Sequence, residues 1–178
     1  YPAVNFGNDL PLLITSLLGN DASTSAQVKL LDIEFPEEFT KKFAGPQFGI
    51  DGVREYTKVK GRPFLLNMVK PCTGLTPEEG AKIFYQTALG GVDFIKDDEL
   101  LGNPSYSHPA DRVKAFRKAA KAAYEESGNH VKYFVNVTSG TAEIMDNVKA
   151  VEDAGADGIM INFAAVGYRD AGDRYQGC

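Results

Sequence analysis

The sequence predicts an α/β fold, and three observations favour the first half of an eight-stranded (βα)8 TIM barrel. From residue 61 onward, apolar runs that suit buried strands alternate with helical patterns, as in parallel sheets covered by helices. A Gly-x-Asp-x-Ile motif at residues 91–95 recurs at residues 155–159, and this spacing suits two βα units of ordinary length. Polar residues follow successive strands, where a barrel assembles its active site. A doubly wound sheet is the alternative, but no glycine-rich dinucleotide motif follows the first strand.

The chain before this alternation predicts shorter, separate elements. Residues 11–18 and 28–35 are apolar runs that indicate two strands, and residues 36–43 indicate a short helix before a Gly-Pro break. A polar stretch follows, with a short helix expected near residues 52–56. We therefore place a domain boundary after residue 46, so that residues 47–178 hold the first four βα units.

Strands and helices then follow in strict alternation. Helix starts and stops are clearest around Thr76-Pro77-Glu78-Glu79, which supplies an N-cap, a proline at the first helical position and a capping-box glutamate. The next helix, over residues 110–127, carries one apolar stripe of Val113, Phe116, Ala120 and Ala123. A third helix ends near Ala154. The four predicted strands cover residues 64–69, 92–97, 131–137 and 155–161.

Composition excludes several classes of function. The formal net charge is -5 with interspersed acids and bases, so the chain has no basic stripe for nucleic acid and no polybasic membrane patch. No apolar run suits a membrane span, and we expect a cytoplasmic protein. The two cysteines and two histidines lack metal-ligand spacing, so a metal site here would use oxygen ligands. The first residue, Tyr1, and the last, Cys178, lead us to expect a fragment cut at both sides.

Residues 90–99 end an apolar strand with one lysine and three consecutive acids. Because side chains alternate along a strand, Lys96 and Asp98 share one face, Asp97 points to the other, and Glu99 follows at the strand end. One interpretation is a structural ion pair. The other is a Mg²⁺ site, in which CO₂ converts the lysine amine to a carbamate and so supplies a third anionic ligand. Carbamate formation needs the neutral amine, and we expect burial to lower the pKa of Lys96.

Lys70 stands at the end of the neighbouring strand. Its amine suits a Schiff-base nucleophile, a phosphate clamp, a general base or a charge at the rim. Beside a metal site the general base is favoured, because a divalent ion acidifies the carbon next to a ketone. A lysine with a lowered pKa would then remove that proton and give a metal-bound enediolate.

These residues resemble a known family. Residues 90–99, GGVDFIKDDE, are similar to the activation-site motif of the ribulose bisphosphate carboxylase (RuBisCO) large subunit and its RuBisCO-like relatives, GG-x-DF-x-KDDE. Residues 61–66 and the Lys70-Pro71 pair resemble the family's first barrel strand and the loop with its proton-abstracting lysine. Residues 15–20 resemble its TS-x-x-GN segment, and residues 45–50 its GP-x-x-GI segment. The similarity therefore covers essentially the whole chain in order.

The resemblance implies a role for each candidate residue. Lys96 is expected to be the carbamylated Mg²⁺ ligand, with Asp98 and Glu99 as the other ligands and Lys70 as the base that contacts and enolises a phosphorylated substrate. Asn20 matches the asparagine that reaches into the partner subunit's site, so a homodimer or higher homo-oligomer is expected. Residues 1–46 would then end an N-terminal α+β (ferredoxin-like) domain.

Two departures from the family pattern shape the expected activity. Carboxylases carry a second lysine two positions after the base and a threonine two positions before it, where this chain has Cys72 and Met68. The missing lysine disfavours carboxylation and leaves enolisation intact. A RuBisCO-like enolase or isomerase is therefore the leading hypothesis, and a true carboxylase is the second. A third hypothesis, of another class, is a catalytically inactive half-barrel. Cys72 is read as either a packed thiol or a catalytic one.

Overall fold

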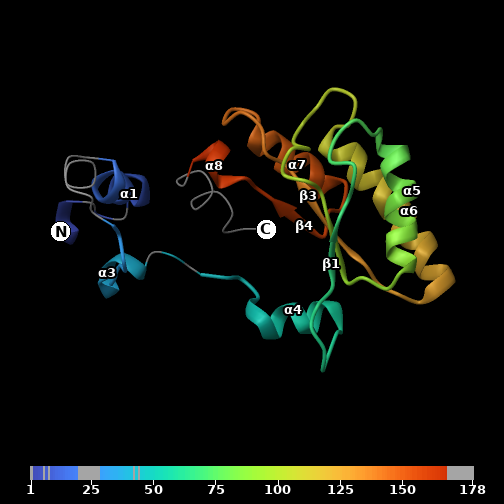
Figure 1. Cartoon of the computed structure of the whole chain (residues 1–178), viewed down its shortest axis with the longest axis horizontal. Helices are drawn as coiled ribbons and strands as arrows, with labels where there is room; N and C mark the ends of the chain where they lie inside the picture. Colours follow the sequence, from blue (N-terminus) through green and yellow to red (C-terminus); the bar gives the residue numbers. More distant parts are fainter. Residues whose placement is uncertain are drawn as a thin grey trace. The chain divides into compact units, whose positions relative to one another are not determined.

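The computed structural model describes residues 2–5, 7, 9–19, 29–41, 43 and 45–167. The chain divides into two compact units, one of Tyr1–Gln47 with Gly167–Cys178 and one of Phe48–Val166. The βα alternation lies in the second unit (Figure 1). Among the described residues, no helix is both long enough and apolar enough to cross a membrane.

The first unit contains short helices where the sequence predicted strands. Residues 11–18 belong to helix α1 (Leu10–Leu18), because Asp9 caps its start by accepting from Leu12 N at 2.8 Å. Its leucines also recur at helical spacing, and the buried Leu13 packs with Phe39. The other described elements of this unit are η1 (Ala3–Asn5) and α3 (Glu37–Thr40), the latter within the predicted helix.

The predicted strand over residues 28–35 is also wrong for its described part. Residues 29–35 form no strand, and Val28 lies outside the described residues. A strand needs a neighbour to pair its backbone groups, and the described part of this unit supplies none. Apolar side chains alone therefore did not produce a strand here.

The second unit confirms the predicted parallel sheet. Its strands are β1 (Leu66–Met68), β2 (Phe94–Lys96), β3 (Lys132–Asn136) and β4 (Gly158–Met160), and they pair in parallel in the order β1-β2-β3-β4. The connecting helices are α5 (Pro77–Leu89), α6 (Pro109–Ser127) and α7 (Ile144–Asp153). The predicted short helix near residues 52–56 is α4 (Gly49–Thr57), and α8 (Phe163–Val166) follows β4.

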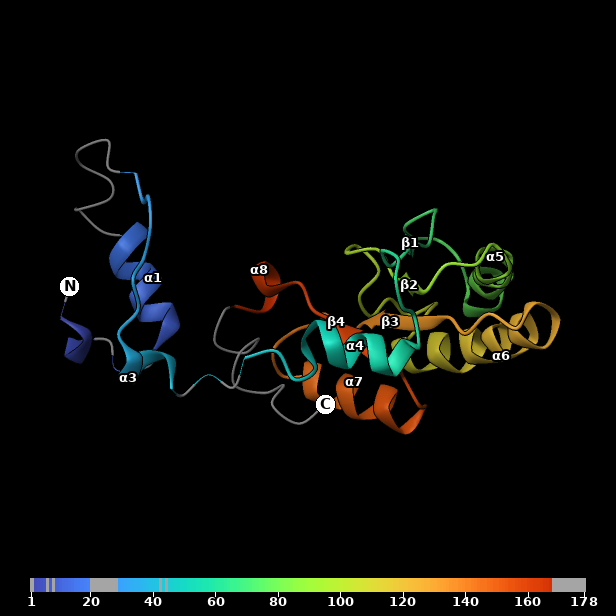
Figure 2. The ribbon, with the colours of Figure 1, turned by 90° about the horizontal axis from the view of Figure 1, so that it is seen from below.

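The helices cover one face of the sheet. Helix α6 packs along β3, and α5 and α7 pack against α6 (Figures 1 and 2). Phe84, Phe116 and Tyr133 form the centre of this core, with ring centroids 4.8–5.6 Å apart. The approach of α5 to α6 requires glycine at Gly80, because a Cβ there would lie 2.9 Å from the Phe116 ring. The capping box predicted at Thr76 is present and starts α5.

The repeated Gly-x-Asp-x-Ile motif has a structural role at the amino ends of the strands. Asp93 accepts from Leu65 N at 2.8 Å and pairs with Arg62 at 2.7 Å. Asp157 accepts from Tyr133 N at 3.2 Å and pairs with Lys132 at 3.1 Å. Each aspartate thus joins its own strand to the preceding one through a backbone N–H and a cation.

Candidate functional site

The carboxyl ends of β1 and β2 bring Lys70 and Asp98 together. Met68 pairs with Lys96 in the sheet, so the residues two positions further along each chain also lie side by side. Lys70 Nζ donates to Asp98 Oδ2 at 2.5 Å, and Leu100 N donates to Asp98 Oδ1 at 2.9 Å. The Asp98 side chain is only 7% exposed, whereas that of Lys70 is 57% exposed. The pair therefore joins a buried carboxylate to an amine that solvent and ligands can reach.

Lys96 forms a second pair beside the first. Its Nζ donates to Glu99 Oε1 at 2.5 Å and to the Asp97 carbonyl oxygen at 3.2 Å, and it lies 3.6 Å from Met160 Sδ on β4. The Lys96 side chain is largely buried, and that of Glu99 is about half exposed. Lys70, Lys96, Asp98 and Glu99 thus form two adjacent ion pairs at one end of the sheet.

The pairing shifts the pKa values of three of these groups. The hydrogen bond from Lys70 lowers the pKa of Asp98, and the hydrogen bond from Lys96 lowers that of Glu99. The same hydrogen bond to Asp98 raises the pKa of Lys70. For a general base at this position, a lowered pKa of Lys70 is expected from the sequence. In this ion-paired form the direction is opposite, because Asp98 stabilises the protonated amine.

Asp97 faces the helices, as strand alternation predicted, and is completely buried. It accepts from Tyr133 Oη at 2.6 Å, Asn136 N at 2.9 Å and Arg112 Nε at 3.1 Å. Burial raises the pKa of Asp97, and these three donors offset part of that rise. Asp97 is therefore held away from the face that carries Lys96 and Asp98.

Sequence reasoning missed Arg112, which is 1% exposed within α6. Its side chain contacts Asp97 just after β2, the end of β3 and the loop between β2 and α6. The available signal was its position: Arg112 lies four residues before Phe116 and next to Val113 on the predicted apolar stripe. A charged residue on a buried helix face needs a buried partner, and Asp97 is that partner.

Three further residues bear on the site: two from the sequence predictions, Asn20 and Cys72, and Asn136. Asn20 is outside the described residues. Cys72 is a half-buried free thiol two residues after Lys70. Asn136, at the end of β3, donates its side-chain amide to the backbone carbonyls of Asp98 (3.1 Å) and Glu99 (3.2 Å).

The side chains at the strand ends supply only part of the ligand set of a divalent cation. Among the described residues, no cluster of three or more His, Cys, Asp or Glu side chains could hold a metal ion. Asp98 and Glu99 supply two carboxylates, which suits Mg²⁺ only if further oxygens are added. Lys96, whose Nζ contacts Glu99, is the third side chain beside these two carboxylates.

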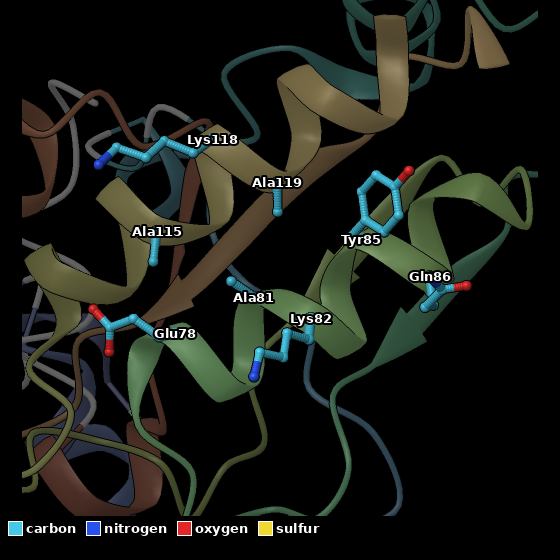
Figure 3. Close-up of a pocket in the computed structure, with 8 residues that line it drawn as sticks. All are labelled: Glu78, Ala81, Lys82, Tyr85, Gln86, Ala115, Lys118 and Ala119. Atoms are coloured by element: carbon cyan, nitrogen blue, oxygen red, sulfur yellow. The ribbon is translucent and has the colours of Figure 1, made fainter. Parts of the chain in front are cut away.

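A surface hollow lies elsewhere, between α5 and α6 (Figure 3). Alanines from both helices line it together with longer polar side chains (Figure 3). None of the four paired residues at the strand ends lines it. Its lining residues are Glu78, Ala81, Lys82, Tyr85, Gln86, Ala115, Lys118 and Ala119.

Comparison with known proteins relates the chain to one family. The catalytic-domain family of the ribulose bisphosphate carboxylase large chain matches residues 49–173. A ribulose bisphosphate carboxylase-like protein of Archaeoglobus fulgidus is 44% identical over 94% of this chain and 38% of its own length. A 2,3-diketo-5-methylthiopentyl-1-phosphate enolase of Bacillus pumilus is 39% identical over 94% of this chain and 41% of its own. A ribulose bisphosphate carboxylase of Methanocaldococcus jannaschii is 37% identical over 94% of this chain and 40% of its own length.

Solved structures agree with these matches. A RuBisCO-like protein from Alicyclobacillus acidocaldarius superposes with a TM-score of 0.88 at 31% identity, over 97% of this chain and 43% of that one. A dimeric archaeal RuBisCO from Hyperthermus butylicus superposes with a TM-score of 0.83 at 35% identity, over 96% of this chain and 40% of that one. The chain thus spans about 40% of the proteins it matches, and its four-stranded sheet corresponds to part of their barrel.

Proposed function

The chain belongs to the ribulose bisphosphate carboxylase large-chain family, and from this membership we propose that it forms part of a RuBisCO-like enzyme that enolises or isomerises a phosphorylated ketose-type substrate. The observation that carries the proposal is the contact between Lys70 and Asp98 beside the Lys96–Glu99 pair. Cys72 and Met68, in place of the carboxylase lysine and threonine, support enolisation over carboxylation. The Bacillus pumilus relative, which is named as an enolase, supports the same choice.

The charges of the site are compatible with Mg²⁺ and a carbamate. In the structure, two lysine cations and two carboxylates cancel. Conversion of Lys96 to a carbamate would replace one positive charge by a negative one and leave an excess of two negative charges. A divalent cation would match that excess, with Lys96, Asp98 and Glu99 as its protein ligands. When bound, Mg²⁺ would polarise the ketone of the substrate and acidify the neighbouring carbon.

Lys70 would act as the proton acceptor at its Nζ atom. Its hydrogen bond to Asp98 raises the pKa of Lys70 in the present form. Engagement of Asp98 as a metal ligand would remove that stabilisation and favour the neutral amine. The exposure of Lys70 allows its amine to reach a substrate bound at the strand ends. One carboxylate would thus connect metal binding to activation of the base.

We further propose that the active protein is a cytoplasmic homodimer or higher homo-oligomer in which Asn20 contacts the substrate bound to the partner subunit. The Hyperthermus butylicus relative is described as dimeric, which supports this assembly. Loops that bind the substrate phosphates would lie in parts of the barrel beyond the four strands described here.

Two other functions have specific support. The Methanocaldococcus jannaschii relative is named as a carboxylase, so fixation of labelled CO₂ onto ribulose bisphosphate tests that activity directly. In the described unit β1 and β4 each pair on one side only, which supports an inactive isolated half-barrel. A single cooperative melting transition of the isolated chain would contradict that third function.

Solvent deuterium exchange tests the leading proposal. A full-length protein containing this chain is incubated in D₂O with Mg²⁺, bicarbonate and either ribulose bisphosphate or 2,3-diketo-5-methylthiopentyl-1-phosphate. We expect deuterium at the carbon next to a ketone, and loss of exchange by about 10²-fold or more in Lys70→Ala. Lys118→Ala, on the exposed face of α6, is the control and should exchange normally. Exchange that is unchanged in Lys70→Ala would refute the role of Lys70.

A further inference from the structure

Behind the candidate site, one buried guanidinium connects three segments of the chain. Arg112 Nε donates to Asp97 Oδ2 at 3.1 Å, after the end of β2. Its Nη2 donates to the Asn136 carbonyl at 2.9 Å, at the end of β3. The loop between β2 and α6 is held by further bonds from Arg112 to three carbonyl oxygens, those of Leu101, Gly102 and Ser107. All three guanidinium nitrogens therefore donate to protein acceptors, and the side chain is almost completely buried.

The contacts continue from Arg112 to the backbone of the proposed metal ligands. Arg112 and Asp97 fix the main chain of Asn136, through its carbonyl oxygen and its N–H respectively. The Asn136 side-chain amide in turn donates to the carbonyl oxygens of Asp98 and Glu99 at 3.1 and 3.2 Å. The buried ion pair thus reaches the backbone of Asp98 and Glu99 through Asn136, in addition to the peptide bond that joins Asp97 to Asp98.

We propose that Arg112 and Asp97 are positioning residues, which set the backbone of Asp98 and Glu99 so that both carboxylates and Lys96 converge on one divalent cation. This inference rests on the proposed function and adds to it two residues that touch neither metal nor substrate. Groups that orient metal ligands through hydrogen bonds typically change metal affinity by about 10- to 100-fold when removed.

A purely structural role is the competing explanation. A buried ion pair is weak evidence for stability, because desolvation opposes the attraction between its charges. Here the guanidinium also binds four main-chain carbonyls, which an apolar side chain of similar volume would leave unpaired. The two explanations differ in their effect on metal affinity, since loss of general stability would not act selectively on the strand end that carries the ligands.

Strand β2 provides a matched control at its other end. Asp93 is also buried, accepts a backbone N–H and pairs with the guanidinium of Arg62, but it lies before the strand. Asp97→Ala and Asp93→Ala therefore delete the same groups from the two ends of one strand. Both should lower thermal stability, and only Asp97→Ala should weaken metal binding.

The experiment measures Mn²⁺ affinity by electron paramagnetic resonance in a full-length protein containing this chain, with saturating bicarbonate and below the melting temperature of each variant. The ¹³C signal of the Lys96 carbamate, from labelled bicarbonate, is recorded in parallel. We expect about 10- to 100-fold weaker Mn²⁺ binding in Asp97→Ala and unchanged binding in Asp93→Ala. If Asp97→Ala does not fold, Arg112→Lys and Tyr133→Phe carry the test, with several-fold weaker binding expected because each deletes only part of the network.

The outcomes separate the inference from the function on which it rests. Absence of bicarbonate-dependent Mn²⁺ binding in the unsubstituted protein would overturn the proposed metal site itself. Normal binding in that protein together with equal Mn²⁺ affinities in Asp97→Ala and Asp93→Ala would overturn the positioning role alone. Where the milder variants carry the test, Mn²⁺ affinities of Arg112→Lys and Tyr133→Phe equal to that of the unsubstituted protein would have the same meaning.

Discussion

Replacement of Phe84 by alanine tests whether the packing of α5 and α6 on β3 holds this half of the barrel together. The Phe84 side chain is 0% exposed, and its ring centroid lies 4.9 Å from that of Phe116 and 5.6 Å from that of Tyr133. Truncation of a buried phenylalanine costs about 3–5 kcal/mol, and each aromatic pair contributes about 0.5–1.5 kcal/mol beyond buried area. Because both pairs are lost, we expect a decrease of about 4–5 kcal/mol in the free energy of unfolding.

Urea unfolding followed by circular dichroism measures this change, as a shift in midpoint at constant slope. Gln86→Ala is the control, since it introduces the same residue at an exposed position of the same helix and should change stability by less than about 0.5 kcal/mol. A loss below about 2 kcal/mol for Phe84→Ala, or equal losses for both variants, would contradict the assigned core.

Two further predictions concern charge. Arg62 lowers the pKa of Asp93 in the folded protein, so the stabilisation that this pair provides is present above the unfolded-state pKa of about 3.9 and is lost as the pH falls through the lower folded value. Asp93→Asn should therefore lower the melting temperature at pH 7. The difference in melting temperature from the unsubstituted protein should shrink as the pH falls towards 3. A difference that does not depend on pH would refute this reasoning. Mg²⁺ with bicarbonate should raise the melting temperature, by the equivalent of about 2.7 kcal/mol at 100 times the dissociation constant, and Lys96→Met should abolish the rise. The same rise in Lys96→Met would exclude Lys96 as a ligand.

The sequence predicted the βα part of the fold well because local signals and tertiary packing agree there. The Thr76 capping box, the stripe around Phe116 and the four apolar runs all correspond to the observed elements. In residues 11–18, an apolar run was read as a strand, although Asp9 and the spacing of the leucines specify a helix. Short apolar runs do not distinguish the two structures, and the cap was the decisive signal.

The candidate site was predicted less completely. Strand alternation was enough to put Lys96 and Asp98 on one face and Asp97 on the other. The expectation that Lys70 lies near these residues followed from placing its strand next to theirs. Strand alternation could not give the individual pairings, because the reach of each lysine depends on side-chain conformation. The role of Arg112 was also hidden, since its partners are one carboxylate and four carbonyl oxygens that come from three separate segments.

Three aspartates also have a consequence for how the sheet assembles. Asp93 joins β1 to β2, Asp97 joins β2 to β3, and Asp157 joins β3 to β4, each by accepting a backbone N–H of the neighbouring strand. Pairing between segments that are distant along the chain is slow, so specific contacts that select the alignment of neighbouring strands matter during folding. A strand displaced by one residue would leave a buried carboxylate without its donor. These aspartates therefore penalise misaligned pairings during folding and favour the native register at each junction of the sheet.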